Sequence, residues 1–161
     1  DDHFLNLFAK LLQSFPVLPL AGASCRFQPV WVDDVAEVVA RCLAEPKLEG
    51  ETFTVAGPKV YTLAELVRYV GRLTGHRRPV LPLPESLAMR QARLLELAPQ
   101  PMMSRDNVRS MRVDNVASGP PLPFGLVPRA LEAVAPLYLG DAAPRQHYYE
   151  YREHKSHKAG A

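Results

Sequence analysis

The 161-residue sequence has few cysteines, no long hydrophobic run and no closely spaced glycines. Its two cysteines, Cys25 and Cys42, are too few for the dense disulfide framework of a small secreted protein. We expect both to be small buried apolar side chains in a reducing, cytoplasmic setting; the alternative is a redox or metal role. No apolar run approaches the roughly 18 residues that span a bilayer, and Asp1-Asp2-His3 lacks the basic start of a secretory signal. The sequence therefore predicts neither a membrane span nor export.

The nine glycines are also scattered, and no two of them form a Gly-x-Gly. A Rossmann-type dinucleotide site needs glycines close together between a strand and a helix, because backbone amides must approach the pyrophosphate. A P-loop is absent too. We therefore expect this chain alone to bind no dinucleotide.

Charge is nearly balanced, with 19 Lys and Arg against 17 Asp and Glu, a formal charge of +2. This balance does not indicate a nucleic-acid partner. At 47% hydrophobic and 22% charged residues, the composition is typical of one soluble globular domain. Periodicity is lost after Gly140, so we expect a domain over residues 1–140 and a flexible polar tail over 141–161.

Helices and short strands alternate along the predicted domain, which indicates an α/β protein. Residues 3–15 are predicted to form an amphipathic helix entered through Asp1 or Asp2, with Phe4, Phe8, Leu11 and Phe15 on one stripe and Leu5 and Leu12 beside them. Strands are predicted at 26–32, 51–55 and, as an edge strand, 79–84; further helices are predicted at 34–45, 62–74, 85–98, 104–112 and 128–138.

Three predicted helices carry more specific signals. Thr62 and Glu65 fit a capping box, in which each side chain accepts from the other residue's backbone amide. In the helix after Asp33-Asp34, the apolar face comprises Val35, Val38, Val39, Cys42 and Leu43. We interpret the two aspartates as helix caps rather than as a pair of catalytic acids. Ser104 and Pro128 mark the expected starts of two later helices.

The polar tail contains two patterns that can also arise by chance. Tyr151 and Lys155 form Tyr-x-x-x-Lys, the spacing with which short-chain dehydrogenases lower the pKa of a phenol for proton transfer. The same tail contains a cluster of three histidines, at positions 147, 154 and 157. With no pocket around the pair and no rigid scaffold for a metal, we interpret both patterns as incidental.

One longer segment, Phe27-Gln28-Pro29-Val30-Trp31-Val32-Asp33-Asp34-Val35-Ala36, resembles the C-terminal part of extended short-chain dehydrogenase/reductases, the NAD-dependent epimerase/dehydratase superfamily. The similarity is greatest to the atypical branch that contains the NAD(P)-binding accessory subunit of respiratory complex I and its bacterial relatives. It continues through residues 2–6, 57–58, 62–66, 78–84, 104–108 and 114–116.

This resemblance implies the C-terminal, substrate-side portion of a Rossmann-type fold, with short strands and several helices. The N-terminal Rossmann half would lie upstream of residue 1, so the chain is expected to be a fragment or a truncated product. NAD(P) would bind the full-length parent rather than this chain. No catalytic, cofactor-binding or metal-binding residue is assigned here.

Substrate contacts are predicted at Arg26, Phe27, Gln28 and Trp31. Sugar-nucleotide epimerases usually carry Arg-x-x-x-His-Val-x-Asp at this strand, but Phe27 and Trp31 occupy the Arg and His positions here. Arg26 lies one residue early, which on a strand turns its side chain to the opposite face. An apolar or quinone-like ligand is therefore expected in place of a sugar nucleotide.

Two functions follow from the resemblance. In the first, the chain is the substrate-binding part of an NAD(P)-dependent oxidoreductase or epimerase-like protein and is not catalytic alone. In the second, the parent is a non-catalytic NAD(P)H-binding assembly or accessory protein that docks to a larger complex, and the bound nucleotide stabilises its fold.

Overall fold

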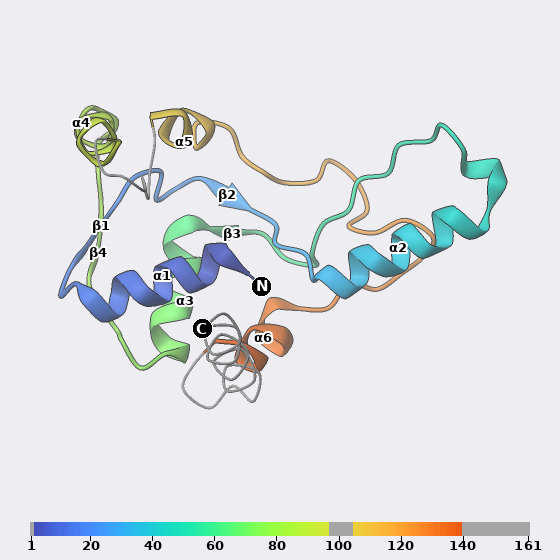
Figure 1. The fold of residues 1–161 in the computed structure, drawn as a ribbon, viewed down its shortest axis with the longest axis horizontal. Helices are drawn as coiled ribbons and strands as arrows, with labels where there is room; N and C mark the ends of the chain where they lie inside the picture. Colours follow the sequence, from blue (N-terminus) through green and yellow to red (C-terminus); the bar gives the residue numbers. More distant parts are fainter. Residues whose placement is uncertain (1, 97–104, 140–161) are drawn as a thin grey trace, which may run out of the picture.

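A computed structural model describes residues 2–96 and 105–139, which form a mixed α/β arrangement (Figure 1). The helices are α1 (His3–Ser14), α2 (Val32–Ala44), α3 (Leu63–Leu73), α4 (Glu85–Leu95), α5 (Arg105–Ser110) and α6 (Leu131–Val134), with 3-10 turns η1 (Pro46–Leu48) and η2 (Ala135–Leu137). The strands are β1 (Leu18–Leu20), β2 (Arg26–Phe27), β3 (Tyr61–Thr62) and β4 (Val80–Pro82).

The main core lies between α1 and α3. As predicted, α1 begins after Asp2, whose carboxylate accepts from the amides of Phe4 at 2.9 Å and Leu5 at 3.2 Å. The buried face lies toward Leu5 and Leu12, beside the predicted stripe: these two residues and Phe8 are buried, whereas the prediction was wrong for Phe4 and Phe15, which are exposed. Phe15 lies past the end of α1, where the chain has turned into extended backbone.

Helix α3 confirms the capping box. The Glu65 amide donates to Thr62 Oγ1, and the Glu65 carboxylate accepts from the Thr62 amide at 2.7 Å. The hydrogen bond from the Thr62 amide, together with one from the Thr62 hydroxyl to the same carboxylate, holds the pKa of Glu65 below its usual range. Gly71 allows α3 to pack closely on α1, since a Cβ at this position would lie 3.4 Å from Leu12 Cδ1. The same Cβ would lie 2.9 Å from the carbonyl oxygen of His76, in the loop after α3. Gly75, at a φ of 73°, follows the end of the helix, where the left-handed backbone favours glycine.

Two small sheets replace the longer strands that the sequence indicates. β1 and β4 pair in parallel with Leu18 opposite Val80, and β2 and β3 pair antiparallel with Phe27 opposite Tyr61. The strand predicted at 26–32 is limited to two residues, since α2 already begins at Val32. The strand predicted at 51–55 is not formed, and β1 was not predicted.

The start of α2 corrects the interpretation of the aspartates as caps. The helix begins at Val32, with Trp31 as the capping residue, so Asp33 and Asp34 lie in its first turn. Asp34 is buried, and its carboxylate accepts from the backbone amide of Arg129 at 2.8 Å. This carboxylate therefore joins the start of α2 to the segment before α6.

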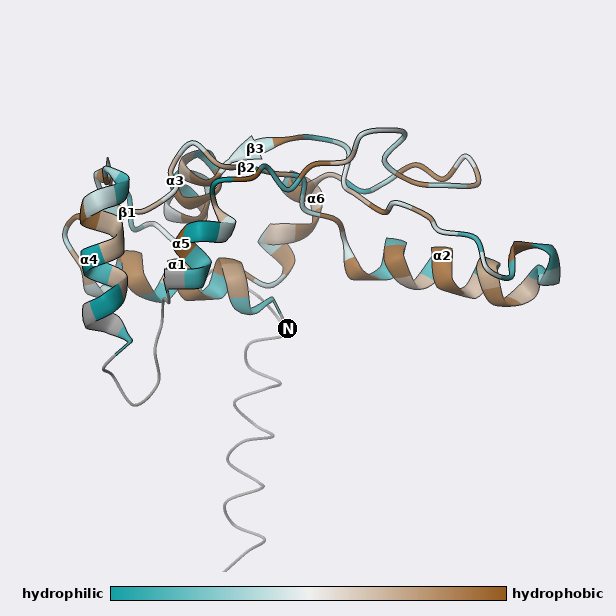
Figure 2. Ribbon diagram, turned by 90° about the horizontal axis from the view of Figure 1, so that it is seen from above, coloured by the Kyte–Doolittle hydropathy of each residue, from teal (hydrophilic) through white to brown (hydrophobic). Residues whose placement is uncertain are grey.

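Helix α2 projects away from the α1–α3 core (Figure 1), and hydrophobic residues run along it (Figure 2). Glu37 and Arg41, four residues apart on this helix, form an ion pair at 2.9 Å. Val38 is buried, but the rest of the predicted apolar face is not fully covered, and Leu43 is 82% exposed. Val32, Ala36, Val39 and Leu43, all exposed, repeat at intervals of four, three and four residues; we call them the α2 stripe.

The later helices follow the predictions with shorter bounds. α4 and α5 begin within a residue of their predicted starts. α6 begins at Leu131 rather than at Pro128, because Ala130 is extended, with φ −72° and ψ 144°. Ser104, Tyr151, Lys155 and the tail histidines lie outside the described residues. Within residues 2–96 and 105–139, no helix is long and apolar enough to cross a bilayer, and no group of three metal-ligating side chains occurs.

Candidate functional site

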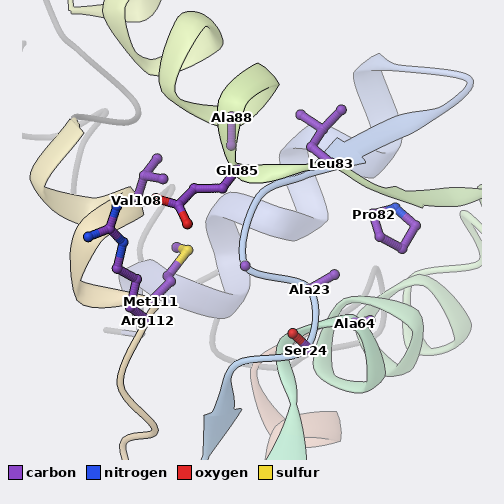
Figure 3. A pocket seen from close by; sticks show the side chains of 11 residues that line it. Ala23, Ser24, Ala64, Pro82, Leu83, Glu85, Ala88, Val108, Met111 and Arg112 are labelled. Carbon is purple, nitrogen blue, oxygen red and sulfur yellow. Dashed lines mark hydrogen bonds and ion pairs between the residues drawn. The ribbon is translucent and has the colours of Figure 1, made fainter.

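A cavity of about 570 Å³ lies where the loop after β1 meets the end of β4 and helices α4 and α5 (Figure 3). The loop is held in place because the Ala23 carbonyl accepts from the Ala64 amide and the Cys25 carbonyl from the Leu63 amide. It thus packs on the first turn of α3. The lining comprises Gly22, Ala23, Ser24, Ala64, Pro82, Leu83, Glu85, Ala88, Val108, Met111 and Arg112.

Most of the lining is apolar, and its charged groups are paired. Glu85, at the start of α4, forms an ion pair with Arg112, which follows α5 (Figure 3). Ser24 supplies a hydroxyl at the cavity edge. Such a lining suits a small ligand held mainly by apolar contact.

Both cysteines are free. Cys25 is buried, as predicted, and Cys42 is half-buried. Burial raises the pKa of the Cys25 thiol, with a further contribution from the Asp114 carboxylate. A raised pKa keeps the thiol protonated near neutral pH, so Cys25 is a poor nucleophile.

The backbone at Gly22 lacks the open space that a dinucleotide site needs. This glycine lies two residues after the end of β1 and adopts a φ of 61°. The Met111 side chain fills the space beside its Cα, because a Cβ there would lie 2.6 Å from Met111 Sδ. A pyrophosphate would need that space for its approach to the backbone.

The four predicted substrate contacts do not line this cavity. Arg26 points to Asp114, with a distance of 2.7 Å from Nε to Oδ2, and its backbone amide donates to Oδ1 of the same carboxylate at 2.9 Å. These two hydrogen bonds hold the pKa of Asp114 below its ordinary value of 3.8. Arg26 therefore closes an ion pair between β2 and the segment after α5.

This pair predicts an acid-dependent loss of stability. A carboxylate with a lowered folded-state pKa stabilises the fold above its unfolded pKa, and this contribution is lost as pH falls through the folded pKa. We expect Asp114→Asn to lower the unfolding midpoint at neutral pH and to flatten the pH dependence below about pH 4. Urea unfolding from about pH 3 to 7 measures both, with Asp106→Asn as the exposed control. Parallel curves for wild type and Asp114→Asn would contradict the assignment.

Phe27 and Trp31 contact aromatic rings elsewhere in the chain. The Phe27 ring lies 5.6 Å from that of Phe4, and Trp31 stacks on Tyr138 with centroids 6.1 Å apart and 19° between the planes. The Tyr138 hydroxyl donates to Asp2 Oδ2 at 3.0 Å. Burial, together with the Asp2 carboxylate, raises the pKa of Tyr138 well above its usual range.

Gln28 is occupied at both ends of its amide. Nε2 donates to the Gly57 carbonyl at 2.7 Å, and Oε1 accepts from the Ala117 amide at 2.9 Å. The side chain thus joins two backbone segments that are 60 residues apart in sequence, since 117 − 57 = 60. A substrate role for Arg26, Phe27, Gln28 and Trp31 stays a prediction. The sequence missed the cavity, whose one local signal is the Gly-Ala-Ser loop after an apolar segment.

Comparison with known proteins identifies the relatives of this chain. It is 33% identical over 119 residues to the mitochondrial NADH dehydrogenase [ubiquinone] 1 alpha subcomplex subunit 9 of Rattus norvegicus. The Arabidopsis thaliana subunit of the same name is 30% identical over 146 residues, and the NADH-ubiquinone oxidoreductase 40 kDa subunit of Neurospora crassa is 32% identical over 117. The chain is related to these subunits. The predicted resemblance to a subunit of respiratory complex I, the NADH-ubiquinone oxidoreductase, is thereby confirmed.

The similarity to alpha subcomplex subunit 9 covers much of this chain but little of its relatives. It includes 72% of the chain and 31% of the rat protein, 82% and 36% for Arabidopsis, and 72% and 30% for Neurospora. The chain thus spans about a third of the length of the curated relatives it matches. No family model matches the sequence.

Among solved structures, a dTDP-4-dehydrorhamnose reductase from Clostridium acetobutylicum aligns with a TM-score of 0.46 and 16% identity, covering 73% of this chain and 39% of that one. Similarity at this level assigns neither a fold nor an activity.

Proposed function

We propose that the chain is the substrate-side portion of an NAD(P)-binding protein that serves as an accessory or assembly subunit of NADH-ubiquinone oxidoreductase. The observation that carries this proposal is the 30 to 33% identity to subunits of that enzyme from an animal, a plant and a fungus. In this proposal NAD(P) is held by the remainder of the protein, the predicted N-terminal Rossmann half, where it stabilises the fold.

Two surfaces support packing against such a remainder. The α2 stripe is apolar and exposed on a helix that projects from the core (Figure 2). Residues 51–55 have the composition of a strand but lack a partner strand in the described part of the chain. The exposed apolar face of a helix can cover the face of a β-sheet, and an unpaired extended segment can add to the edge of one.

The test is co-migration in cells that contain the native enzyme. We expect the tagged full-length protein to migrate with NADH-ubiquinone oxidoreductase in native electrophoresis, and its deletion to reduce the assembled enzyme. The isolated 161-residue chain should give no saturable signal with NADPH. Migration only as a free protein, with no effect of deletion on assembly, would contradict the accessory role.

The cavity beside Gly22 supports a second candidate function. Its volume of about 570 Å³ and its apolar lining suit a small apolar or quinone-like substrate of an NAD(P)-dependent oxidoreductase. Turnover of such a substrate by the full-length protein with NAD(P)H, reduced by filling the cavity with Ala88→Phe, would favour this function. Unchanged turnover in that variant would exclude the cavity as the substrate site.

A further inference from the structure

Two neighbouring segments of the described structure contain no acidic residue. No Asp or Glu occurs from His3 to Val32 or from Leu66 to Pro84. The two segments meet in the structure, because Arg78 Nε donates to the Leu12 carbonyl at 3.3 Å and the Leu18 amide donates to the Pro79 carbonyl at 2.9 Å. Figure 1 shows this end, where α1 turns into β1 and the loop after α3 leads into β4, on the opposite side from α2.

Apolar side chains are exposed at this end. Leu18 and Leu20 of β1 are buried, so Val17 and Pro19, which alternate with them, point outward. Leu81 is paired with Pro19 and is 54% exposed, and Phe15, just before this strand, is 51% exposed. The outer side of the β1–β4 pair therefore continues into an exposed aromatic ring.

Basic side chains lie next to these apolar groups. Arg77 and Arg78 are exposed and directly precede β4. Arg72 is exposed on the last turn of α3, and Lys10 lies on the exposed side of α1. Among the described residues none of these four cations forms an ion pair, and Arg72 lies over the Tyr69 ring at 5.6 Å. We call Phe15, Val17, Pro19, Leu81, Arg77 and Arg78 the basic-apolar surface.

We propose that the basic-apolar surface docks on an anionic lipid bilayer. The headgroups of such a bilayer attract lysine and arginine near the surface, and apolar side chains gain free energy by entering the boundary below them. The chain would lie on the membrane rather than cross it. A nucleic acid offers the same negative charge, but its phosphate backbone gives no comparable apolar phase for Val17 and Leu81. This inference does not depend on the proposed accessory role.

The experiment is flotation of the full-length protein with vesicles of phosphatidylcholine alone or with about a third phosphatidylserine. We expect binding to the anionic vesicles only, and release at about 1 M salt, because screening shortens the reach of the charges. The double variant Arg77→Gln with Arg78→Gln should weaken the partition coefficient about 30-fold. Leu81→Ser should also weaken it, at unchanged salt dependence.

The matched control is Arg90→Gln with Arg93→Gln, which removes the same charge from exposed positions on α4. Equal losses in the two double variants would show attraction by net charge alone and would overturn the proposal. So would equal binding to both vesicle types, no binding to either, or tighter binding to a mixed-sequence oligonucleotide. Circular dichroism verifies the fold of each variant, and Arg77→Gln alone replaces the double variant if the latter does not fold.

Discussion

Replacing Gly57 with alanine is expected to cost about 4 kcal/mol of unfolding free energy or more, enough to unfold a marginally stable domain. A Cβ at this position would lie 1.8 Å from the Pro29 carbonyl oxygen and 2.9 Å from its carbonyl carbon. Backbone atoms cannot move aside as a flexible side chain does. The backbone of Gly57 is also held in place, because its carbonyl accepts a hydrogen bond from Gln28 Nε2 at 2.7 Å.

Urea denaturation followed by circular dichroism measures the loss, and Gly119→Ala is its matched control. A Cβ at Gly119 would meet nothing within 4 Å, and the residue does not have a positive φ. The control should change the unfolding free energy by less than about 1 kcal/mol. We expect the change to be an increase, because alanine restricts the unfolded chain more than glycine does. If Gly57→Ala were as stable as Gly119→Ala, the backbone of Gly57 would not pack against the Pro29 carbonyl as closely as the structure shows.

The second large effect is expected at Leu12, which is 1% exposed between α1 and α3. Leu12→Ala should lower the unfolding free energy by about 3 kcal/mol, because it removes buried methyl groups and leaves a cavity. Relaxation should be limited, since the Gly71 side of α3 already approaches the Leu12 side chain and the His76 backbone closely. Chemical denaturation again provides the measurement.

Leu43→Ala provides the same change of side chain at an exposed position of α2. Its cost should stay within about 0.5 kcal/mol, because the leucine is already in water and alanine favours the helix. If Leu43→Ala were as destabilising as Leu12→Ala, the end of α2 would be buried in solution, for example in a second copy of the chain. Sedimentation at two concentrations would then reveal that association.

The helices could be predicted because their signals are local. Asp2 before α1 and the Thr62–Glu65 capping box before α3 act within four residues of the helix start, and the structure confirms both. The buried stripe of α1 was less predictable. Phe4, Phe8, Leu11 and Phe15 keep helical spacing, but the position of α3 decides that Leu5 and Leu12 face inward.

The strands could not be predicted in the same way, because a strand needs a neighbour. β1 contains a proline at position 19 and has three residues, yet it forms because Val80 and Leu81 lie beside it. Residues 51–55 have a stronger strand composition but no paired strand among the described residues. The residues of neither segment show whether a distant segment will pair with it.

The candidate site shows the same limit. The sequence located residues 27–36 as the segment that resembles the family, but it did not predict the contacts that Arg26, Gln28 and Trp31 make within the fold. Asp114 is 88 residues from Arg26, and Tyr138 is far from Trp31 along the chain. The cavity depends on α5 and the Gly22 loop, which share no motif that would bring them together.

The crossed amide of Gln28 has a consequence for any molecule that reaches this segment. Nε2 and Oε1 of Gln28 each already form a hydrogen bond within the protein, and Arg26 Nε is engaged by the Asp114 carboxylate. An incoming polar molecule would therefore compete with internal bonds and would have to replace each one it broke. The rings of Phe27 and Trp31 lie beside these groups, so a molecule that leaves the internal bonds intact is held along this stretch largely by the fit of its apolar surface.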